Sequence, residues 1–192
     1  MMFGKNPGTD KTATIIPEGS IGAELGVWKG DSSAKFIKRA KHIHLVDSWT
    51  IEAYKGSDEH GGYDAYLNRY STLVGSDNPA DFQKYYDKIY RSVVKRFAGQ
   101  SVTIHRMPTD KWFDTFTEKL DWIYVDASHS YEGCLHDLHK SWNMIKVGGY
   151  LLCDDFSDKK EGVKNAIKEF AKQKNLNIDN FYMDQVKFVK EN

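Results

Sequence analysis

Five times along this 192-residue chain, a short apolar run is followed by a stretch whose apolar residues recur at helical spacing. The runs have the length of buried strands, and several of them end in acidic residues. Alternation of this kind predicts a parallel sheet with helices on both faces. The predicted strands are Ser20–Val27, His42–Asp47, Ser101–Arg106, Trp122–Asp126 and Tyr150–Asp154, and the predicted helices are Asp31–Ala40, Pro79–Gly99, Lys111–Leu120, Tyr131–Ile145 and Gly162–Lys174.

The end of the chain departs from this alternation. Phe181–Val189 has the pattern of two strands joined by a tight turn near Asp184 and Gln185. A linker this short cannot hold a parallel crossover, so the two strands must pair antiparallel. The predicted fold is therefore α/β, a doubly wound, mostly parallel, Rossmann-like sheet with a C-terminal antiparallel hairpin. A nicotinamide dehydrogenase would more often continue with further strand–helix units.

We expect one domain covering residues 1–192, because a chain of this length fits a single core. Residues 1–18 are polar and contain Gly and Pro, which indicates a loose lead-in. Residues 48–78 look irregular, and we expect residues 50–80 to be a lid insertion over the substrate. Its candidate platforms for a sugar or an aromatic ring are Tyr63, Tyr66 and Tyr70. The alternative is that these tyrosines only pack a helix onto the sheet.

The charge balance bounds the partners. The 27 basic residues match the 27 acidic ones, which argues against a general binder of nucleic acid or of membrane surfaces. The two cysteines form no CxxC pair, and no apolar run has the length of a signal-peptide core or a membrane span. We expect a cytoplasmic protein with no nucleic-acid partner and no membrane contact. The many aromatic residues are compatible with a homodimer.

The first predicted strand ends in a glycine turn that differs from the GxGxxG fingerprint of dinucleotide sites. Gly26 lets the backbone approach a ligand closely. Glu24 and Asp31 flank the turn, and these acids disfavour a phosphate group. The turn suits a cationic ligand that carries an amino group.

The next two strand ends supply candidate contacts to a nucleoside. Asp47 lies about twenty residues past the glycine turn, where an acid can accept hydrogen bonds from ribose hydroxyls. Met107 offers an apolar face to an adenine, and Thr109 or Asp110 can meet its amino group. The alternatives are that Asp47 caps a loop and that the residues after Met107 form an ordinary turn.

Three blocks of sequence resemble class I S-adenosylmethionine-dependent methyltransferases, and above all the group described as methyltransferase-domain family 24. The blocks are GAELGVWKGDSS, LVDSW followed by GSDEHGGYDAY, and VDASHSYEGCLHDLHKSWNMIKVGGYLLCDDF. Together they span most of residues 22–156. The chain departs from the family pattern at Ala127, where the family usually has Gly, and in the extra residues Thr50–Lys55.

The resemblance implies S-adenosylmethionine as the cofactor. The residues that it places around this cofactor are Glu24, Gly26, Asp47 and Asp126, with Trp49 packed beside the adenosine. We add the neighbouring Ser48, together with Met107 and Thr109, to the expected cofactor-binding residues.

Acidic residues end two adjacent predicted strands at Asp126 and at Asp154–Asp155. Three converging carboxylates repel one another unless a cation lies between them, and oxygen ligands favour Mg²⁺, Ca²⁺ or Mn²⁺. The same acids resemble the metal site of catechol-type and macrolide-sugar O-methyltransferases. We therefore expect Asp126, Asp154 and Asp155 to bind Mg²⁺ or another divalent cation. The alternative is that Asp126 serves the cofactor and the other two cap a loop.

His129 follows Asp126 by three residues, and as a neutral imidazole it can take the proton of an acceptor hydroxyl. The alternative is a loop histidine bonded to the backbone. The predicted activity is O-methylation of a small molecule or a sugar hydroxyl, with Asp126 and His129 as catalytic residues. Two other functions stay open: a nicotinamide-dependent oxidoreductase or sugar-nucleotide enzyme, and a non-catalytic S-adenosylmethionine-binding module.

Overall fold

A computed structural model describes residues 6–56 and 59–191. Its centre is a seven-stranded sheet in the order β3-β2-β1-β4-β5-β7-β6. Strands β1 to β5 are parallel, β7 runs antiparallel to β5, and β6 pairs antiparallel with β7. This topology confirms the predicted fold class. The strands are β1 (Ile21–Leu25), β2 (His42–Asp47), β3 (Val102–Arg106), β4 (Leu120–Val125), β5 (Ile145–Cys153), β6 (Asp179–Tyr182) and β7 (Gln185–Val189).

Side chains alternate along the central strands between two apolar cores, one on each face of the sheet. On β2, Leu45 belongs to one core and Val46 to the other. Helices α1, α2 and α4 cover the core of Leu45, and α5, α6 and α7 cover the core of Val46. The bounds are α1 (Pro7–Ile15), α2 (Ser33–Phe36), α4 (Pro79–Arg96), α5 (Thr109–Thr115), α6 (Tyr131–Met144), α7 (Glu161–Lys174) and the short 3₁₀ helix η3 (Asp158–Lys160).

The expected loose lead-in contains helix α1, so that expectation was wrong for the described residues from Asn6 onward. Asn6 caps the helix, because its Oδ1 accepts hydrogen bonds from the N–H groups of Gly8 at 3.0 Å and Thr9 at 3.3 Å. Pro7 sits in the first turn, where its missing N–H costs nothing. The Thr12 hydroxyl donates to Gln185 Oε1 at 2.7 Å and thereby ties α1 to β7.

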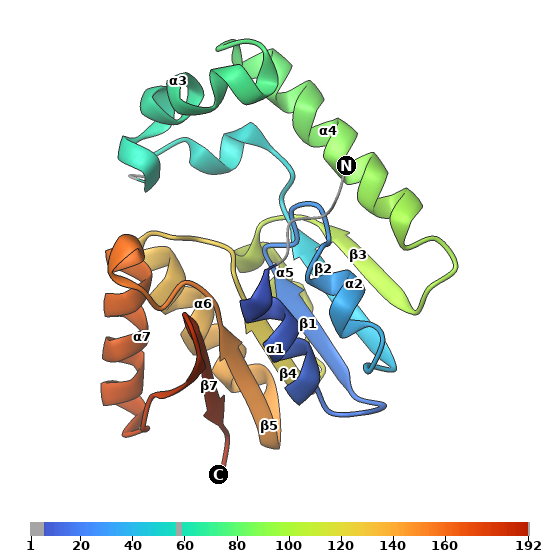
Figure 1. The fold of residues 1–192 in the computed structure, drawn as a ribbon, viewed down its shortest axis with the longest axis vertical. Helices are drawn as coiled ribbons and strands as arrows, with labels where there is room; N and C mark the ends of the chain where they lie inside the picture. The colour runs from blue at the N-terminus through green and yellow to red at the C-terminus, as the bar shows by residue number, and fades with distance from the viewer. Residues whose placement is uncertain (1–5, 57–58, 192) are drawn as a thin grey trace.

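The segment expected to be irregular also contains regular structure. Two 3₁₀ turns, η1 (Ile51–Tyr54) and η2 (Glu59–Gly61), lead into helix α3 (Tyr63–Val74), which Gly75 ends in a left-handed conformation. We call η1, η2 and α3 the cap. Figure 1 shows α3 and the start of α4 as a layer of their own above the sheet. Ser57 and Asp58, which belong to the quoted GSDEHGGYDAY block and to the expected lid, lie outside the described residues.

One smaller difference concerns the junction between α6 and β5. The strand after α6 begins at Ile145, earlier than expected, because the chain leaves the helix directly into β5. Within the described part of the chain, none of the helices combines the length and the apolar character needed to cross a bilayer.

Histidines form an unexpected cluster on β2 and β3. His44 is buried, its Nδ1 lies 3.1 Å from Nε2 of His105, and its ring packs against Phe116. Burial and the neighbouring His42 and His105 lower the pKa of His44 from 6.5 to about 4. The folded chain therefore resists protonation at a site that the unfolded chain protonates readily.

We predict that the free energy of unfolding falls as the pH drops from about 6.5 to about 4, because only the unfolded chain binds a proton at His44 in that range. The loss attributable to this residue is on the order of 2 kcal/mol. Urea unfolding of the wild type and of His44→Gln at pH 7.5 and pH 4.5 measures it: the variant should lose less stability than the wild type. His139→Gln is the control, and an equal loss in His44→Gln and wild type would contradict the prediction.

Candidate active site

A cleft of about 1050 Å³ lies between the carboxyl ends of the central strands and the cap. One wall carries Gly26, Asp47, Ser48, Thr109, Asp126 and His129, and the cap contributes Tyr54, Glu59, His60, Tyr66 and Tyr70. Most of the expected cofactor and catalytic residues therefore meet in one place. Glu24, Trp49, Met107, Asp154 and Asp155 do not line this cleft.

Gly26 lies where the ends of β1 and β4 come together. Its φ is +85°, and a Cβ at this position would stand 1.8 Å from the carbonyl oxygen of Asp126. Only glycine permits both the backbone conformation and the contact. Gly26 was expected to make room for a ligand. Its absent side chain instead lets the ends of β1 and β4 come close together, and this places Asp126 beside the glycine turn.

Glu24 differs from its expected role. Its side chain has no exposed surface, and its two carboxylate oxygens accept hydrogen bonds from the hydroxyls of Ser32 and Ser33. Burial raises the pKa of Glu24 from 4.5 to about 8, although the serine hydroxyls oppose the rise. Glu24 is therefore mostly uncharged at neutral pH and ties the glycine turn to α2, instead of presenting a negative charge to the cleft.

Asp47 lines the cleft and is fixed by the backbone. Its Oδ2 accepts from the N–H of Trp28 and its Oδ1 from the N–H of Trp49, both at 2.8 Å. Burial raises the pKa of Asp47, and these backbone hydrogen bonds act against the rise. Each carboxylate oxygen has a second lone pair, so the pair of oxygens can still accept from two ribose hydroxyls.

Trp49, Met107 and Thr109 fit the expected adenosine contacts only in part. Trp49 has no exposed surface, and its Nε1 donates to the Trp28 carbonyl at 2.8 Å, so it supports the floor instead of lining the cleft. Met107 packs against the core. Thr109 lines the cleft, but its hydroxyl donates to Asp137 Oδ1 at 2.8 Å.

The loop after β4 holds His129 between two carboxylates. Its Nε2 lies 3.0 Å from Asp155 Oδ2 and 3.5 Å from Asp126 Oδ1, and Lys160 Nζ lies 3.3 Å from its Nδ1. Burial and Lys160 lower the pKa of His129, but the two carboxylates outweigh them and raise it to about 9. The ring thus carries a proton at neutral pH, and the expectation of a neutral imidazole does not hold for the chain in this state.

The three acids expected to converge, Asp126, Asp154 and Asp155, line one second, small cavity together with His129, and each has its own hydrogen-bond partners there. Asp154 turns inward: its Oδ2 accepts from the Tyr124 hydroxyl at 2.5 Å, and its Oδ1 accepts from the Gln185 side chain. Asp155 adopts a left-handed backbone with φ of 63°, and its Oδ2 faces His129, while its carboxylate stays within 4.8 Å of that of Asp154. The sequence could not show that basic partners, His129 and Lys160, would compensate Asp155.

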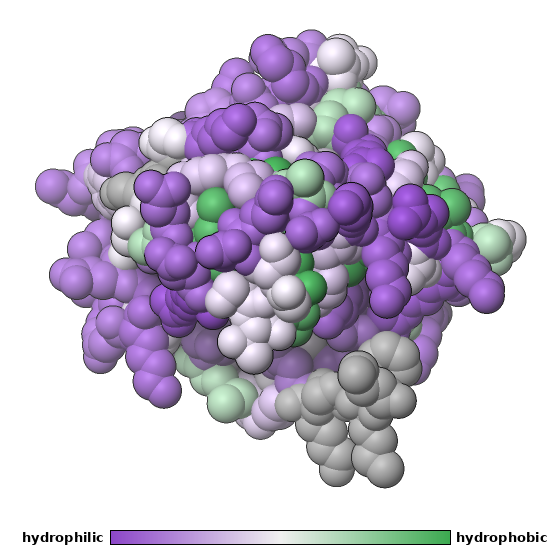
Figure 2. Space-filling view, turned by 90° about the horizontal axis from the view of Figure 1, so that it is seen from above, coloured by the Kyte–Doolittle hydropathy of each residue, from purple (hydrophilic) through white to green (hydrophobic). Residues whose placement is uncertain are grey.

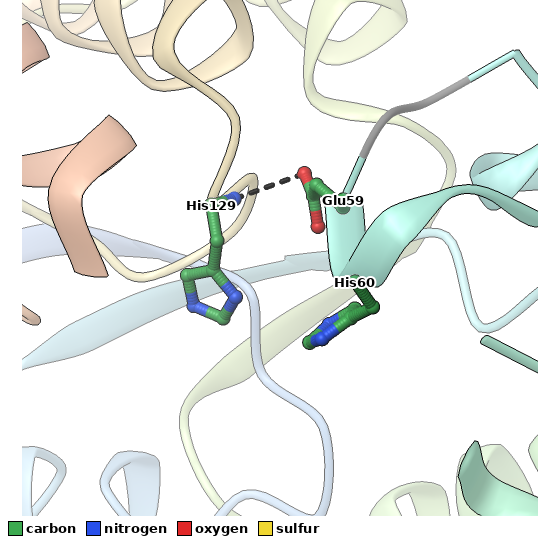
Figure 3. Close-up of side chains that lie close together, drawn as sticks. All are labelled: Glu59, His60 and His129. Atoms are coloured by element: carbon green, nitrogen blue, oxygen red, sulfur yellow. Dashed lines mark hydrogen bonds between the residues drawn. The ribbon is translucent and has the colours of Figure 1, made fainter. Parts of the chain in front are cut away.

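Glu59 is a site residue to which the sequence assigned no role, although it belongs to the GSDEHGGYDAY block. Its Oε1 accepts hydrogen bonds from the Ser128 hydroxyl at 2.5 Å, the His129 N–H at 2.9 Å and the Ser130 N–H at 3.2 Å. Figure 3 shows the bond between the cap and the loop that carries His129. These donors directly precede α6, and the dipole at the N-terminus of this helix also favours a negative charge. The acidic residue of the GSDEHGGYDAY block was the signal that could have revealed this contact.

The cap holds a cluster of aromatic rings. Tyr54 and Tyr66 are stacked with centroids 3.9 Å apart, and Tyr70 and His60 lie 4.7 Å and 5.4 Å from Tyr66. The Tyr66 hydroxyl is 2.5 Å from that of Tyr86 on α4. Tyr66 and Tyr70, two of the three expected platforms, therefore line the cleft, and Tyr54 joins them.

A sheet in this strand order, with a cleft at the carboxyl ends of β1, β2 and β4, has the architecture of class I S-adenosylmethionine-dependent methyltransferases. The model of the "Methyltransferase domain" family, number 24 of that name, matches residues 23–156, and the chain belongs to this family. S-adenosylmethionine is accordingly its cofactor. No curated protein matches the chain.

Solved structures share the fold at low sequence identity. A crystal structure from Staphylococcus aureus, described as a caffeoyl-CoA O-methyltransferase, matches with a TM-score of 0.63 at 12% identity. The match covers 98% of this chain and 85% of the other. A crystal structure from Streptococcus mutans, described as a methyltransferase in complex with S-adenosylhomocysteine (SAH), matches with a TM-score of 0.61 at 12% identity. The match covers 98% of this chain and 99% of the other. The structure of an rRNA methylase from Streptococcus thermophilus matches with a TM-score of 0.59 at 11% identity, and the match covers 100% of both chains. The fold thus lends no support to the expected absence of a nucleic-acid partner.

We predict that the ligand-free wild type loses stability as the pH rises from about 4.5 to about 8, because in that range the unfolded chain ionises Glu24 and the folded chain does not. Each pKa unit corresponds to about 1.4 kcal/mol, so the total is a few kcal/mol at most. Glu24→Gln should therefore be more stable than the wild type at pH 8 and close to it at pH 5 in urea unfolding. Glu18→Gln, on the surface, is the control; a deficit of Glu24→Gln that is equal at both pH values would count against the assignment.

We predict that Glu59→Gln loosens both the cap and the start of α6, because a neutral amide accepts hydrogen bonds more weakly than a carboxylate. Amide hydrogen exchange at His129 and Ser130 should accelerate by roughly tenfold. Exchange in α3 should rise with it. Glu52→Gln, an exposed change in η1, is the matched control, and unchanged exchange in Glu59→Gln would show that the contact contributes nothing.

Proposed function

We propose that this chain is an O-methyltransferase that methylates a hydroxyl of a small acceptor bound under the cap. The observation that carries the proposal is the single cleft that Asp47 lines on the cofactor side and Tyr54, Tyr66 and Tyr70 line on the cap side, with Asp126 and His129 between them. S-adenosylmethionine supplies an activated methyl group on a sulfonium ion.

The residues of this chain supply binding, orientation and a proton acceptor. Asp47 holds the ribose, and the cap aromatics hold the acceptor and exclude water. Burial raises the pKa of the Asp126 carboxylate, which makes it a better proton acceptor, and the His129 ring beside it keeps its own proton. The acceptor hydroxyl would give its proton to the Asp126 carboxylate as its oxygen takes the methyl group, the sulfur–methyl bond would break, and SAH would leave with the electron pair of that bond. Alignment of the reacting atoms supplies most of the acceleration, about 7–11 kcal/mol in well-oriented systems.

The expected Mg²⁺ site at Asp126, Asp154 and Asp155 stays a prediction, and these acids already have partners within the protein. The Asp154 carboxylate accepts hydrogen bonds from Tyr124, Gln185 and the N–H of Asp155. The positively charged imidazole of His129 lies between Asp126 and Asp155. The proposed reaction therefore contains no step that involves Mg²⁺.

A small acceptor is favoured over RNA by two features. The formal net charge is zero, whereas phosphate-backbone binding needs a basic surface. The face of the molecule seen from above is mostly hydrophilic with only small apolar patches (Figure 2). Of the cap rings that line the cleft, Tyr66 is buried, and Tyr54 and Tyr70 are half-buried. Membership of the methyltransferase family argues against the alternative of a nicotinamide-dependent enzyme. An activity assay distinguishes a methyltransferase from a non-catalytic binding module.

We expect methyl transfer from labelled S-adenosylmethionine to phenols, catechols or sugars in a panel that also contains total rRNA. Asp126→Asn and His129→Asn should each lower kcat by roughly a hundredfold or more, the usual contribution of a positioned acid or base. Asp158→Asn, an exposed change, should leave it unaltered. Asp47→Ala should weaken SAH binding about tenfold in calorimetry, because it removes the expected ribose acceptors.

Two results would refute parts of this proposal. SAH binding without transfer to any acceptor would favour the non-catalytic module. Transfer to rRNA alone would contradict the small acceptor and leave methyl transfer in place.

A further inference from the structure

Three side chains that bind metals well meet at the junction between the cap and the sheet edge. Glu59 and His60 come from η2 in the cap, and His129 comes from the loop between β4 and α6. One ligand atom of each lies within 4.8 Å of the others. Figure 3 shows the three side chains directed toward a common space.

Two imidazoles and one carboxylate form a donor set suited to Mn²⁺, Fe²⁺, Co²⁺ or Zn²⁺, whereas Mg²⁺ and Ca²⁺ prefer oxygen atoms alone. We propose that Glu59, His60 and His129 bind one divalent transition-metal ion, which fastens the cap over the cleft. This site is separate from the acids expected to bind Mg²⁺, and the proposal does not depend on the methyl acceptor.

His129 is held as metal-binding histidines usually are. Its Nε2 faces the carboxylates of Asp155 at 3.0 Å and Asp126 at 3.5 Å. Histidine ligands commonly present one nitrogen to a carboxylate, which fixes the ring and leaves the other nitrogen for the metal. Here that other nitrogen is Nδ1.

The two ligands from the cap are also fixed before any ion binds. The three hydrogen bonds from Ser128, His129 and Ser130 set the orientation of the Glu59 carboxylate. His60 has a left-handed backbone with φ of 58°, uncommon for a residue other than glycine, and its ring packs beside Tyr66. Such conformations persist when the surrounding structure holds them, and they concentrate at functional sites.

Lys160 occupies the position that faces Nδ1 of His129. Its Nζ lies 3.3 Å from Nδ1 of His129 and 3.5 Å from Asp155 Oδ2. An entering metal ion must displace this ammonium group, which can keep its contact with Asp155. His129 must release a proton to the solvent as the metal–nitrogen bond forms. Lys160 therefore competes with the metal ion for the position next to Nδ1 of His129.

Co²⁺ titration of the full-length protein, followed by visible absorption and calorimetry, tests the site. We expect one Co²⁺ per chain with a spectrum of nitrogen ligation, and no displacement by equimolar Mg²⁺. His60→Ala should weaken binding at least tenfold. Lys160→Met, which keeps the aliphatic stem and removes the charge, should tighten it threefold or more.

His136→Ala, which removes an exposed histidine on α6, is the matched control and should bind as the wild type does. Circular dichroism without metal verifies that each variant is folded. Unchanged Co²⁺ affinity in His60→Ala would overturn the proposal and move the ion to the acids around Asp126 and Asp155. Loss of binding in His136→Ala, or weaker binding in Lys160→Met, would also overturn it. Failure of the wild type to bind Co²⁺ would overturn the metal site and leave the methyltransferase proposal untouched, because binding is measured without turnover.

Discussion

The close approach of Gly26 to the carbonyl of Asp126 is the constraint on which the rest of the site depends. Two parallel strands can meet this closely at their carboxyl ends only where one of them carries no side chain. The contact places the β1 turn, which holds Asp47 through the Trp28 N–H, next to the β4 loop, which holds His129. Asp47, which is expected to bind the cofactor, and the proposed catalytic residues Asp126 and His129 thereby share one cleft.

The acidic residues next to the cleft are compensated mainly by the protein itself. Glu24 is buried with two serine hydroxyls and is mostly neutral, while Asp155 faces His129 and Lys160. Isolated buried carboxylates would be costly, so each finds a partner or takes up a proton. An arrangement of acids that looks suited to a metal in the sequence is thus largely balanced without one, and the transition-metal site proposed here lies on the opposite nitrogen of His129.

The cap and the sheet are joined at the loop between β4 and α6. Glu59 accepts hydrogen bonds from Ser128, His129 and Ser130, which directly precede α6, so a change in the cap position changes the support of the His129 ring. The tyrosines of the cap are packed against one another and against α4. Access to the acceptor side and the geometry of His129 therefore depend on the same contact.

The sequence alone determined the sheet, because the alternation of apolar runs and helical stretches, with a final linker too short for a crossover, permits few topologies. It also determined that Gly26, Asp47, Asp126 and His129 meet, since the ends of parallel strands lie on one edge. Only the tertiary structure decided the states of Glu24, Asp154 and His129, because burial and partners distant in sequence set their charge and direction. The same holds for α1 and for the contact of Glu59 with α6: a helix with weak periodicity and a hydrogen bond across about seventy residues leave no local pattern.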